Sequence, residues 1–277
     1  MIGGSFALAI RRTGFRGAIL GVGSQKTLAR ARELGAIDQA STAKEAAAEA
    51  DLIFLAQPVQ AILTILPELA SVVRPSALVT DAGSTKAAIS EAGKKAFSAG
   101  NFLGGHPLAG KERRGIDAAD ANLFVGRTWV LTPDFPEVME RPVVKAYLDV
   151  LLAIGALPVS LPAMEHDRIL ALTSHLPQLA STALSAALSS ELPAASVEGR
   201  PLFGPALLDS TRLALSPFSV WGDILATNRE HIRAALQSYI LKLQQFANDL
   251  NDEPGPDLEH EFQVAAQFSR LLRPPRD

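Results

Sequence analysis

Short apolar runs alternate with helical patterns over the first part of the chain. Apolar runs separated by helices indicate a parallel sheet that is buried on both faces. Strands are predicted at residues 17–22, 52–56, 77–80, 102–104, 128–131 and 157–160. Helices are predicted at residues 3–14, 26–34, 42–50, 85–98 and 143–154, and Gly35 is placed to end the second of them. The pattern predicts an α/β fold with a doubly wound, mostly parallel sheet.

After Pro162 only helical spacing continues. Helices are predicted at residues 164–190, 204–215 and 217–249, with no strand signal between them. From Asn251 the composition turns to Asp, Glu, Pro and Gly, which is typical of a tail, with one short helix predicted at 257–272. The chain therefore divides into an α/β domain at 1–162, an all-α domain at 163–250 and a C-terminal tail at 251–277.

The composition is globular and excludes several kinds of function. Apolar residues make up 48% of the 277 residues and charged residues 20%. The net charge of -3 gives no basic field for nucleic acid or an anionic membrane. The absence of cysteine excludes disulfides, thiolate nucleophiles and Cys-based zinc sites, and it agrees with a cytoplasmic location. The apolar runs are too short to span a bilayer, and the N-terminus lacks the basic leading segment of a signal peptide.

The chain opens on Gly3-Gly4-Ser5 at the start of an apolar helix. In a Rossmann-like dinucleotide-binding fold, the strand-to-helix turn carries G-x-G-x-x-G, and the helix N-terminus faces the pyrophosphate. Only the last glycine of that fingerprint is present here, so two glycines that simply begin a helix are the simpler interpretation of this fragment alone. In the Rossmann interpretation, the cofactor-binding candidates are Gly3, Gly4 and Ser5, with Gln57 and Pro58 after the strand at 52–56.

The next predicted strand runs into Gly23-Ser24-Gln25-Lys26. An acidic residue here would bind the ribose 2′-hydroxyl of NAD and repel a 2′-phosphate. No acid is present, and Ser24 and Lys26 could instead accept the phosphate of NADP. A solvated turn before a helix is equally compatible. The expected cofactor is NAD(P)+, and this turn favours NADP.

Four further segments carry candidate chemistry. They are DAGSTK at 81–86, GGHPLAGKERRG at 104–115, HDRILALTSHLP at 166–177 and DSTRLALSPFSVWGDILATN at 209–228. In order and content they resemble the prephenate/arogenate (cyclohexadienyl) dehydrogenase family, and the resemblance runs from Met1 to about Gln245. It implies oxidative decarboxylation of prephenate to 4-hydroxyphenylpyruvate in tyrosine biosynthesis, or of arogenate directly to tyrosine. It also implies a homodimer formed by the helical domain, and NAD as the usual cofactor.

Asp81, Ser84 and Lys86 follow a predicted strand, at the sheet edge where ligands bind in open α/β folds. Ser84 can form a hydrogen bond with a ligand or cap the following helix. The resemblance implies that Ser84 bonds the ring hydroxyl of the substrate. Lys86 could hold a substrate anion or be an exposed helix lysine.

His106 stands between two glycines and a proline, directly after a predicted strand. Its ordinary pKa lies near neutrality, so it can accept a proton at working pH. The resemblance implies that it polarises the C4 hydroxyl as hydride leaves that carbon; a structural loop histidine is the alternative. In the charged loop that follows, Glu112 matches a substrate-binding position of the family, whereas Lys111 replaces a small residue and its role is open.

His166 and His175 are nine residues apart in one predicted helix, on nearly opposite faces, so we do not expect them to share a metal. For His166 a structural, hydrogen-bonded role is the preferred interpretation. Gln178 stands where the family commonly has a second histidine near the substrate side chain, which leaves prephenate and arogenate both open.

Arg212 is the best substrate ligand by type, because a guanidinium binds a carboxylate through two parallel hydrogen bonds. A surface salt bridge with Asp209 is the alternative, and the family match favours substrate binding. Trp221 and Asp223 also match family positions, although Trp221 could be ordinary core. No cluster of metal-ligand residues is evident.

The family pattern has a strand and two spaced glycines before this Gly-Ser, and Met1 stands where leucine is usual. Because some bacterial start codons are also leucine codons, we expect an in-frame strand and G-x-G in the DNA just upstream; a stop codon there would contradict this. For the chain as written we expect an unpaired edge in the middle of the sheet, weak cofactor binding and poor stability.

Two rival interpretations remain. One is a β-hydroxyacid dehydrogenase, which uses a catalytic lysine on the interdomain helix, where this chain has His166, Asp167 and Arg168. The other is a catalytically impaired binding or regulatory dimer, which the incomplete fingerprint favours and the presence of Ser84 and His106 disfavours.

Overall fold

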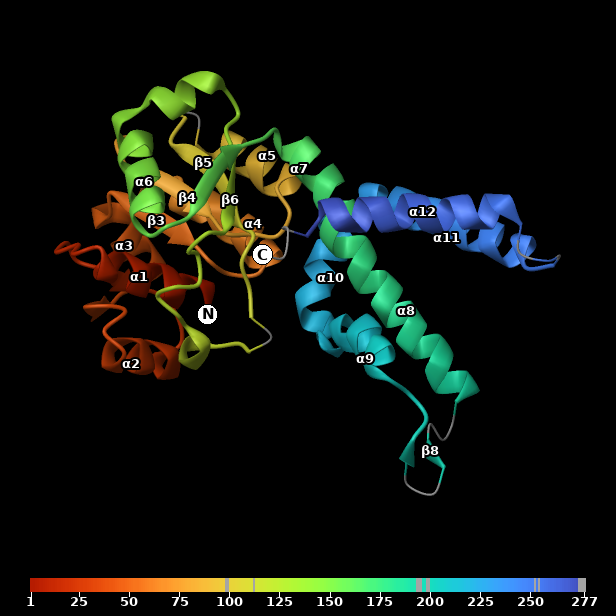
Figure 1. Ribbon diagram of the computed structural model, residues 1–277. Helices are drawn as coiled ribbons and strands as arrows, with labels where there is room; N and C mark the ends of the chain where they lie inside the picture. Colours follow the sequence, from red (N-terminus) through yellow and green to blue (C-terminus); the bar gives the residue numbers. More distant parts are fainter. Residues whose placement is uncertain are drawn as a thin grey trace. The chain divides into compact units, whose positions relative to one another are not determined.

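The computed structural model describes residues 1–97, 100–111, 113–192, 196–197, 200–251, 253 and 255–273 (Figure 1). The chain forms two compact units, residues 1–229 and 230–277. The helices of the first unit are α1 (Ile2–Arg12), α2 (Gln25–Glu33), α3 (Ala43–Glu49), α4 (Val59–Leu69), α5 (Ala87–Ala96), α6 (Pro142–Ala153), α7 (Ala163–Leu170), α8 (Leu176–Glu191), α9 (Pro205–Thr211) and α10 (Phe218–Thr227). The strands are β1 (Leu20–Gly21), β2 (Gln39–Ala40), β3 (Leu52–Leu55), β4 (Leu78–Asp81), β5 (Phe102–Pro107), β6 (Thr128–Thr132), β7 (Leu157–Ser160), β8 (Ser196–Val197) and β9 (Arg200–Pro201). Short helical turns are η1 (Ile116–Ala118), η2 (Pro136–Glu140), η3 (Ala171–His175, a π-helical turn) and η4 (Arg212–Leu215).

Local capping signals begin and end helices in the α/β part. The Ser24 hydroxyl caps α2 by accepting a hydrogen bond from the backbone N–H of Thr27. Thr42 and Glu45 form a capping box at the start of α3. Gly35 follows α2 with φ at +69°, a left-handed conformation that favours glycine, which confirms its predicted role.

The main sheet contains five strands in the order β3-β4-β5-β6-β7. The β3–β4, β4–β5 and β6–β7 pairs are parallel, whereas β5 and β6 are antiparallel. The carboxyl ends of β3, β4 and β5 therefore lie at one edge of the sheet. This arrangement confirms the α/β, mostly parallel fold, and it gathers the segments after three strands at one place.

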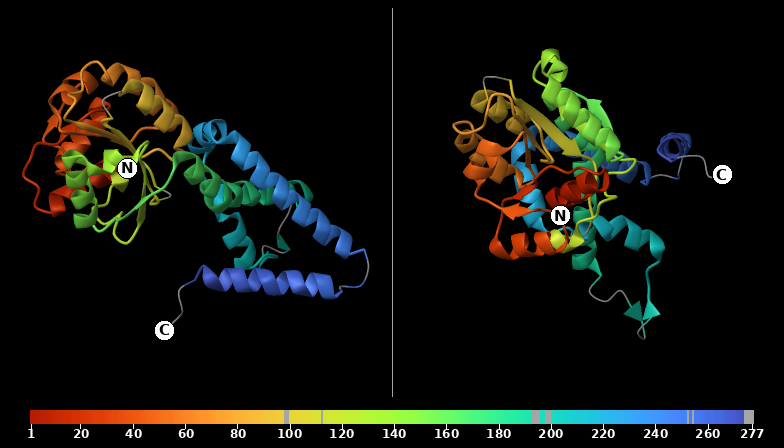
Figure 2. Two further views of the ribbon diagram at one scale, coloured as in Figure 1. Left: turned by 90° about the horizontal axis from the view of Figure 1, so that it is seen from above. Right: turned by 90° about the vertical axis from the view of Figure 1, so that its left-hand side faces the viewer.

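Helices cover both faces of this sheet (Figure 2). On one face, α1 and α6 pack through Phe6 and Tyr147 against the buried Trp129 of β6. On the other face, α4 and α5 pack against β3, β4 and β5, with Ile62 and Ile89 fully buried. Successive residues of one strand face opposite sides of the sheet, which is why both residues at the start of β4 and of β5 are apolar: Leu78 and Leu103 pack on one face, and Val79 and Phe102 on the other.

The strands nearest the N-terminus form a sheet of their own. β1 and β2 are paired in parallel with each other and, among the described strands, with no other. The outer edge of β3 likewise has no partner among the described strands. The sheet is thus interrupted between β1 and β3, in agreement with the expected unpaired edge. The predicted strand at 17–22 is correspondingly reduced to two residues, Leu20–Gly21.

Several elements differ from the sequence prediction. The pattern does not predict α4, although its buried residues have helical spacing, because Pro67 interrupts the helical signal. β5 extends to Pro107 through residues of low strand propensity, so His106 lies inside a strand and not in a loop. The helical half is also not entirely α, because β8 and β9 form a two-residue antiparallel pair that is too short to leave a pattern.

Helices α11 (Arg229–Asp249) and α12 (Pro256–Leu271) belong to the second unit. The Lys242 ammonium of α11 pairs with the Glu261 carboxylate of α12 at 2.8 Å. The predicted tail helix at 257–272 is confirmed by α12, which leaves Phe262, Phe268 and Leu271 largely exposed. Within the described residues, no helix combines the length and the apolar character needed to cross a membrane.

Candidate active site

A buried ion pair anchors the segment between β4 and α5. The Lys86 ammonium contacts the Asp81 carboxylate, and both side chains are fully buried. Asp81 Oδ2 also accepts the backbone N–H of Gly83 at 2.7 Å. Lys86 is therefore not an exposed helix lysine, and the expectation that it holds a substrate anion does not fit an ammonium committed to Asp81. Burial lowers the pKa of Lys86, and the charge of Asp81 opposes that effect.

The same carboxylate fixes the strand that carries His106. Asp81 Oδ1 accepts the backbone N–H of Gly105 at 3.0 Å. A Cβ at Gly105 would lie 2.6 Å from the Asp81 carbonyl oxygen, so only glycine permits this close approach. Gly105 and Asp81 together thus set the geometry of the two strand ends, which places His106 beside the β4–α5 segment.

His106 is the first member of a chain of hydrogen bonds. Its Nδ1 atom lies 2.8 Å from Nε2 of His166, and Nδ1 of His166 lies 2.7 Å from Oδ1 of Asp167. His166 and Asp167 are buried on α7, whereas His106 is half-buried. The preferred interpretation of His166 as a hydrogen-bonded histidine is correct, but the sequence does not show that its partner is His106.

Asp167 also caps helix α5 from outside. Its two carboxylate oxygens accept the backbone N–H groups of Lys86 at 2.7 Å and Ala87 at 2.9 Å. Of the two alternatives for Ser84, helix capping does not occur, because α5 begins at Ala87 and a carboxylate on another helix takes that position. Ser84 is half-buried, and its hydroxyl has no hydrogen-bond partner in the part of the chain that the structure describes.

His175 lies near the same network, contrary to the expectation that it faces away from His166. The π-helical turn η3 between α7 and α8 shifts the helical register, so a separation of nine residues no longer gives opposite faces. Asn228 links the two elements: its side-chain amide donates to the Asp167 carbonyl at 2.7 Å and lies 3.3 Å from His175 Nδ1. The His175 ring also contacts the Trp221 ring edge to face, with centroids 5.9 Å apart.

Burial holds the pKa values of His106 and His175 below the ordinary histidine value. Burial is the largest cause that lowers the pKa of His106 well below the ordinary value of 6.5. Electrostatic interactions with His166, Lys86 and His175 lower the pKa of His106 further. For His175, burial lowers the pKa to about 4, against an opposing effect of Asp167. Neutral imidazole is the form that can accept a proton or a hydrogen bond near pH 7.

His175 should make the protein less stable in acid. Its pKa is about 4 when folded and near 6.5 when unfolded, so the unfolded state binds more protons between these values. The contribution of His175 to the free energy of unfolding is fully present above pH 6.5. It is lost as the pH falls toward 4, by up to about 1.4 kcal/mol per pH unit. Urea unfolding at pH 7 and pH 5 measures the loss, which should be smaller in His175→Gln. An equal loss in both proteins would contradict the assignment.

Helix α8 holds the turn that carries Arg212. Gln178 is buried, and its side-chain amide donates to the Leu213 carbonyl at 2.8 Å. The Ser181 hydroxyl accepts the backbone N–H of Ala214 at 3.2 Å. Arg212 itself is exposed at the start of η4. Gln178 thus supports the backbone next to Arg212, a role that its family position does not reveal.

Two candidate residues lie on α10, the aromatic Trp221 and the acidic Asp223. Trp221 is half-buried and donates from Nε1 to the Ser216 hydroxyl at 2.9 Å, so it is not an ordinary core residue. Asp223 accepts the backbone N–H of Gln60 at 3.0 Å and so caps α4. Helices α4 and α5 are therefore both capped by carboxylates from the helical part of the first unit.

Three of the cofactor-binding candidates, Gly3, Gln57 and Pro58, lie near the carboxyl end of β3. At Gly3 of α1, an added Cβ would be 3.2 Å from Cβ of Ala56, so the helix start meets the end of β3 beside the exposed Gln57 and Pro58. A Cβ at Gly4 would lie 2.4 Å from the Ile116 side chain, which agrees with a glycine required for close packing. Ser5 is fully buried, and its hydroxyl accepts the backbone N–H of Asp120, so this hydroxyl is used inside the protein.

At the second candidate turn, Ser24 is exposed and already caps α2, while Lys26 is exposed on the first turn of that helix. The first turns of α1 and α2 contain no acidic residue. Both helix starts therefore remain compatible with an anionic group.

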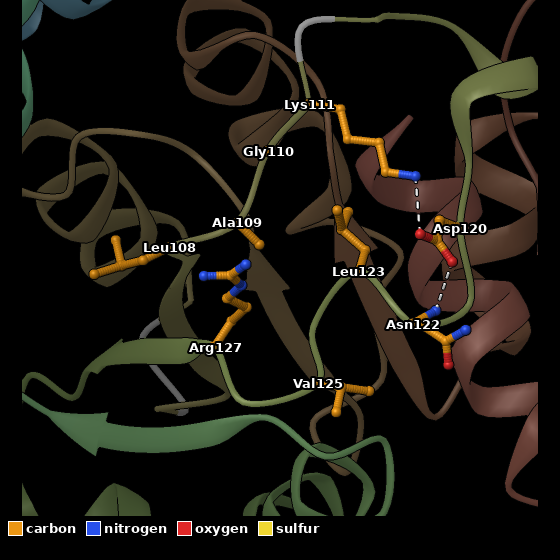
Figure 3. Close-up of a pocket in the computed structure, with 9 residues that line it drawn as sticks. All are labelled: Leu108, Ala109, Gly110, Lys111, Asp120, Asn122, Leu123, Val125 and Arg127. Atoms are coloured by element: carbon orange, nitrogen blue, oxygen red, sulfur yellow. Dashed lines mark hydrogen bonds and ion pairs between the residues drawn. The ribbon is translucent and has the colours of Figure 1, made fainter. Parts of the chain in front are cut away.

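A cavity of about 350 Å³ lies beyond the end of β5 (Figure 3). Lys111 reaches across it to Asp120, with Nζ and Oδ2 2.8 Å apart, and the Arg127 side chain lies beside Leu108 and Ala109. Lys111 thus ties its loop to the segment that follows η1, which gives this departure from the family a structural role. Glu112 lies outside the described residues.

The strand and helix order is that of an α/β, Rossmann-like part followed by a helical part, and candidate site residues lie at the carboxyl edge of the sheet. Two family models match the chain: "Prephenate dehydrogenase, nucleotide-binding domain" over residues 6–159 and "Prephenate dehydrogenase, dimerization domain" over residues 162–264. The chain belongs to the prephenate dehydrogenase family.

Individual relatives agree with this assignment. The prephenate dehydrogenase of Lactococcus lactis is 31% identical over 98% of this chain and 75% of its own length. The A. aeolicus prephenate dehydrogenase, solved with hydroxyphenyl propionate and NAD+, superposes with a TM-score of 0.85 at 28% identity, covering 98% of this chain and 94% of that one. Synechocystis arogenate dehydrogenase superposes with a TM-score of 0.81 at 30% identity, covering 98% and 96%.

Proposed function

We propose that the protein catalyses the oxidative decarboxylation of prephenate to 4-hydroxyphenylpyruvate, with a nicotinamide dinucleotide as the hydride acceptor. The observation that carries the proposal is the placement of His106. It lies on β5 at the carboxyl edge of the sheet, close to the segment that carries Ser84, and its inner ring nitrogen is held by the buried His166. This placement occurs in a chain that matches both halves of the family.

His106 and Ser84 act on the C4 hydroxyl of the substrate. Nε2 of His106 takes up the hydroxyl proton as the C4–H bond breaks and its electron pair leaves as hydride. The bond between C1 and the ring carboxylate breaks, its electrons enter the ring, and CO2 leaves. The held proton returns to the phenolic oxygen, so no net proton is released. A bound nicotinamide supplies the acceptor for the hydride. Assistance by a general base of this kind is worth about 10²–10⁴-fold.

Arg212 binds a substrate carboxylate through its guanidinium, and Trp221 and Gln178 lie on the elements that flank it. Glu112 remains a proposed substrate contact on its sequence position. Gln178 offers a neutral amide where the family commonly has histidine, so it does not select between the keto group of prephenate and the amino group of arogenate. Oxidation of arogenate directly to tyrosine is therefore the second candidate, supported by the similarity to the Synechocystis arogenate dehydrogenase.

The residues present fit a dinucleotide in part. Gly3 and Gly4 begin α1 without an acidic residue in its first turn, and Gln57 and Pro58 are exposed beside them, so this edge suits a pyrophosphate. Ser24 and Lys26 would hold the adenosine ribose or its 2′-phosphate. The absence of an acid at this turn favours NADP, whereas the complex of the A. aeolicus relative contains NAD+.

We further infer that residues 1–162 bind the dinucleotide and that residues 163–250 complete the substrate site and form a homodimer. Support comes from the dimerization-domain model and from large apolar side chains that the helical segment exposes. Leu208, Leu215 and Phe218 are 57%, 82% and 76% exposed. Apolar groups of this size are commonly covered by a second subunit.

The reaction is tested by following reduced nicotinamide with prephenate or arogenate offered against NAD+ or NADP+, each over a wide range of cofactor concentrations. Turnover with one pair supports the function and names substrate and cofactor. No turnover with any pair, in folded protein that binds cofactor, would favour the impaired binding or regulatory dimer.

Replacing Arg212 with lysine should raise the KM for substrate about ten- to hundredfold with little change in kcat, because an ammonium cannot make the two parallel hydrogen bonds. Steady-state kinetics with the preferred pair measure the effect. Arg74→Lys is the matched control, since Arg74 pairs with Asp51 before β3 and β4, at the other end of the sheet. A similar KM in wild type and Arg212→Lys would remove Arg212 from the substrate site.

A further inference from the structure

Asp167 links helix α7 to the start of α5, and it contacts His166, the hydrogen-bond partner of the candidate catalytic His106. Its carboxylate receives three donors: the backbone N–H groups of Lys86 and Ala87 and Nδ1 of His166. Asn228 also binds the backbone carbonyl of Asp167. The side chain is 1% exposed, so each of these contacts is shielded from water.

These contacts determine where the ring protons lie. An ionised carboxylate only accepts hydrogen bonds, so His166 must present N–H at Nδ1. In the neutral ring, Nε2 of His166 is then an acceptor, and His106 must donate to it from its own Nδ1. The nitrogen that remains on His106 is Nε2, which carries a free lone pair.

We propose that Asp167 is a positioning residue that sets the protonation pattern of both histidines and so keeps Nε2 of His106 ready to accept a proton. If His166 instead carried a proton on Nε2, that atom would donate to Nδ1 of His106. His106 would then be protonated on Nε2 and could not accept the substrate proton. The chain of hydrogen bonds runs from the N-terminus of α5, through Asp167 and His166, to Nδ1 of His106, on the ring that carries the reacting Nε2.

The same carboxylate also aligns the substrate-facing segment. By capping α5 at Lys86 and Ala87, Asp167 fixes the backbone two and three residues after Ser84. One side chain thus sets the position of both groups proposed to contact the C4 hydroxyl. The catalytic consequence rests on the function proposed above, whereas the positions of the ring protons do not.

The test is the tautomer of each histidine, read from ¹⁵N NMR of histidine-labelled protein, where a bare ring nitrogen and an N–H nitrogen resonate far apart. In wild type we expect both His106 and His166 to be protonated on Nδ1 at neutral pH. Asp167→Asn should move the His166 proton wholly or partly to Nε2, and His106 should follow. In the assay, kcat should fall by about 10²–10⁴-fold with KM nearly unchanged.

If Asp167→Asn folds poorly, two further variants still test the proposal. His166→Asn leaves Asp167 in place to cap α5, but it removes Nε2 of His166, the acceptor for Nδ1 of His106. The tautomer of His106 should therefore change although the cap is intact. Asp223→Asn removes a carboxylate cap of the same kind from α4 and should leave both tautomers as in wild type. Protonation of His106 on Nε2 in wild type, or unchanged His106 in both Asp167→Asn and His166→Asn, would overturn the proposal. Intact tautomers without turnover of any substrate would instead count against the proposed reaction alone.

Discussion

Replacing His106 with asparagine should lower kcat by about 10²–10⁴-fold and leave the KM for substrate within a few-fold. Asparagine can still fill the space on β5, but its amide cannot take up the hydroxyl proton as hydride leaves. The loss is therefore confined to the transition state and is measured by the rate of reduced nicotinamide formation at saturating substrate. His260→Asn, at an exposed position on α12, is the matched control and should behave like wild type.

The pH dependence provides a second check on His106. Because burial and the nearby positive groups hold its pKa well below 6.5, the neutral base persists into mildly acidic solution. We expect kcat/KM of the wild type to stay level down to about pH 6.5 and to fall only below it, as His106 becomes protonated. An acid limb above the ordinary histidine value, or a His106→Asn enzyme of normal kcat, would contradict the assignment.

Replacing Lys86 with methionine should have the largest effect on stability, a loss of about 3–5 kcal/mol in the free energy of unfolding. The Asp81 carboxylate would lose its only cationic contact among the described residues while remaining fully buried. Its bonds to the backbone of Gly83 and Gly105 cannot replace a charge partner. Urea unfolding followed by circular dichroism measures the change.

Two control variants show whether the loss of stability in Lys86→Met comes from leaving the Asp81 charge buried without a partner. Lys95→Met breaks an ion pair with Glu91 in which the side chains are 74% and 67% exposed, and it should cost no more than about 0.5 kcal/mol. The double variant Asp81→Asn with Lys86→Met removes both buried charges and should recover part of the loss. If Lys86→Met is as mild as Lys95→Met, the buried pair does not have the importance assigned to it.

Much of the α/β architecture depends on interactions between residues close in the chain and can therefore be predicted from the sequence. The strand at 157–160 and the stop at Gly35 are predicted correctly because strand periodicity and helix capping involve residues close in the chain. The motifs around His106 and Arg212 identify the family for the same reason, since each motif is a short segment. Where local propensity and tertiary contacts disagree, prediction fails: β5 continues past the predicted end at Gly104, through residues 105–107, because pairing with β6 holds residues that seldom favour strands.

The environment of each candidate was decided by contacts between distant segments. Lys86 resembles an ordinary helix-start lysine in sequence, and only the fold buries it against Asp81. His106 and His166 are 60 residues apart, and Asp167 is 81 residues from the helix start that it caps. The π-helical turn that brings His175 back toward this network has no sequence period that predicts it.

The sequence by itself thus determined the sheet-and-helix order, the family and the residue types available for proton transfer and carboxylate binding. Tertiary structure decided which of those residues meet, which are buried and which ring nitrogen remains free. The physical reason is that hydrophobic periodicity and capping act within a few residues, whereas desolvation, charge pairing and hydrogen-bond direction depend on neighbours supplied by other elements.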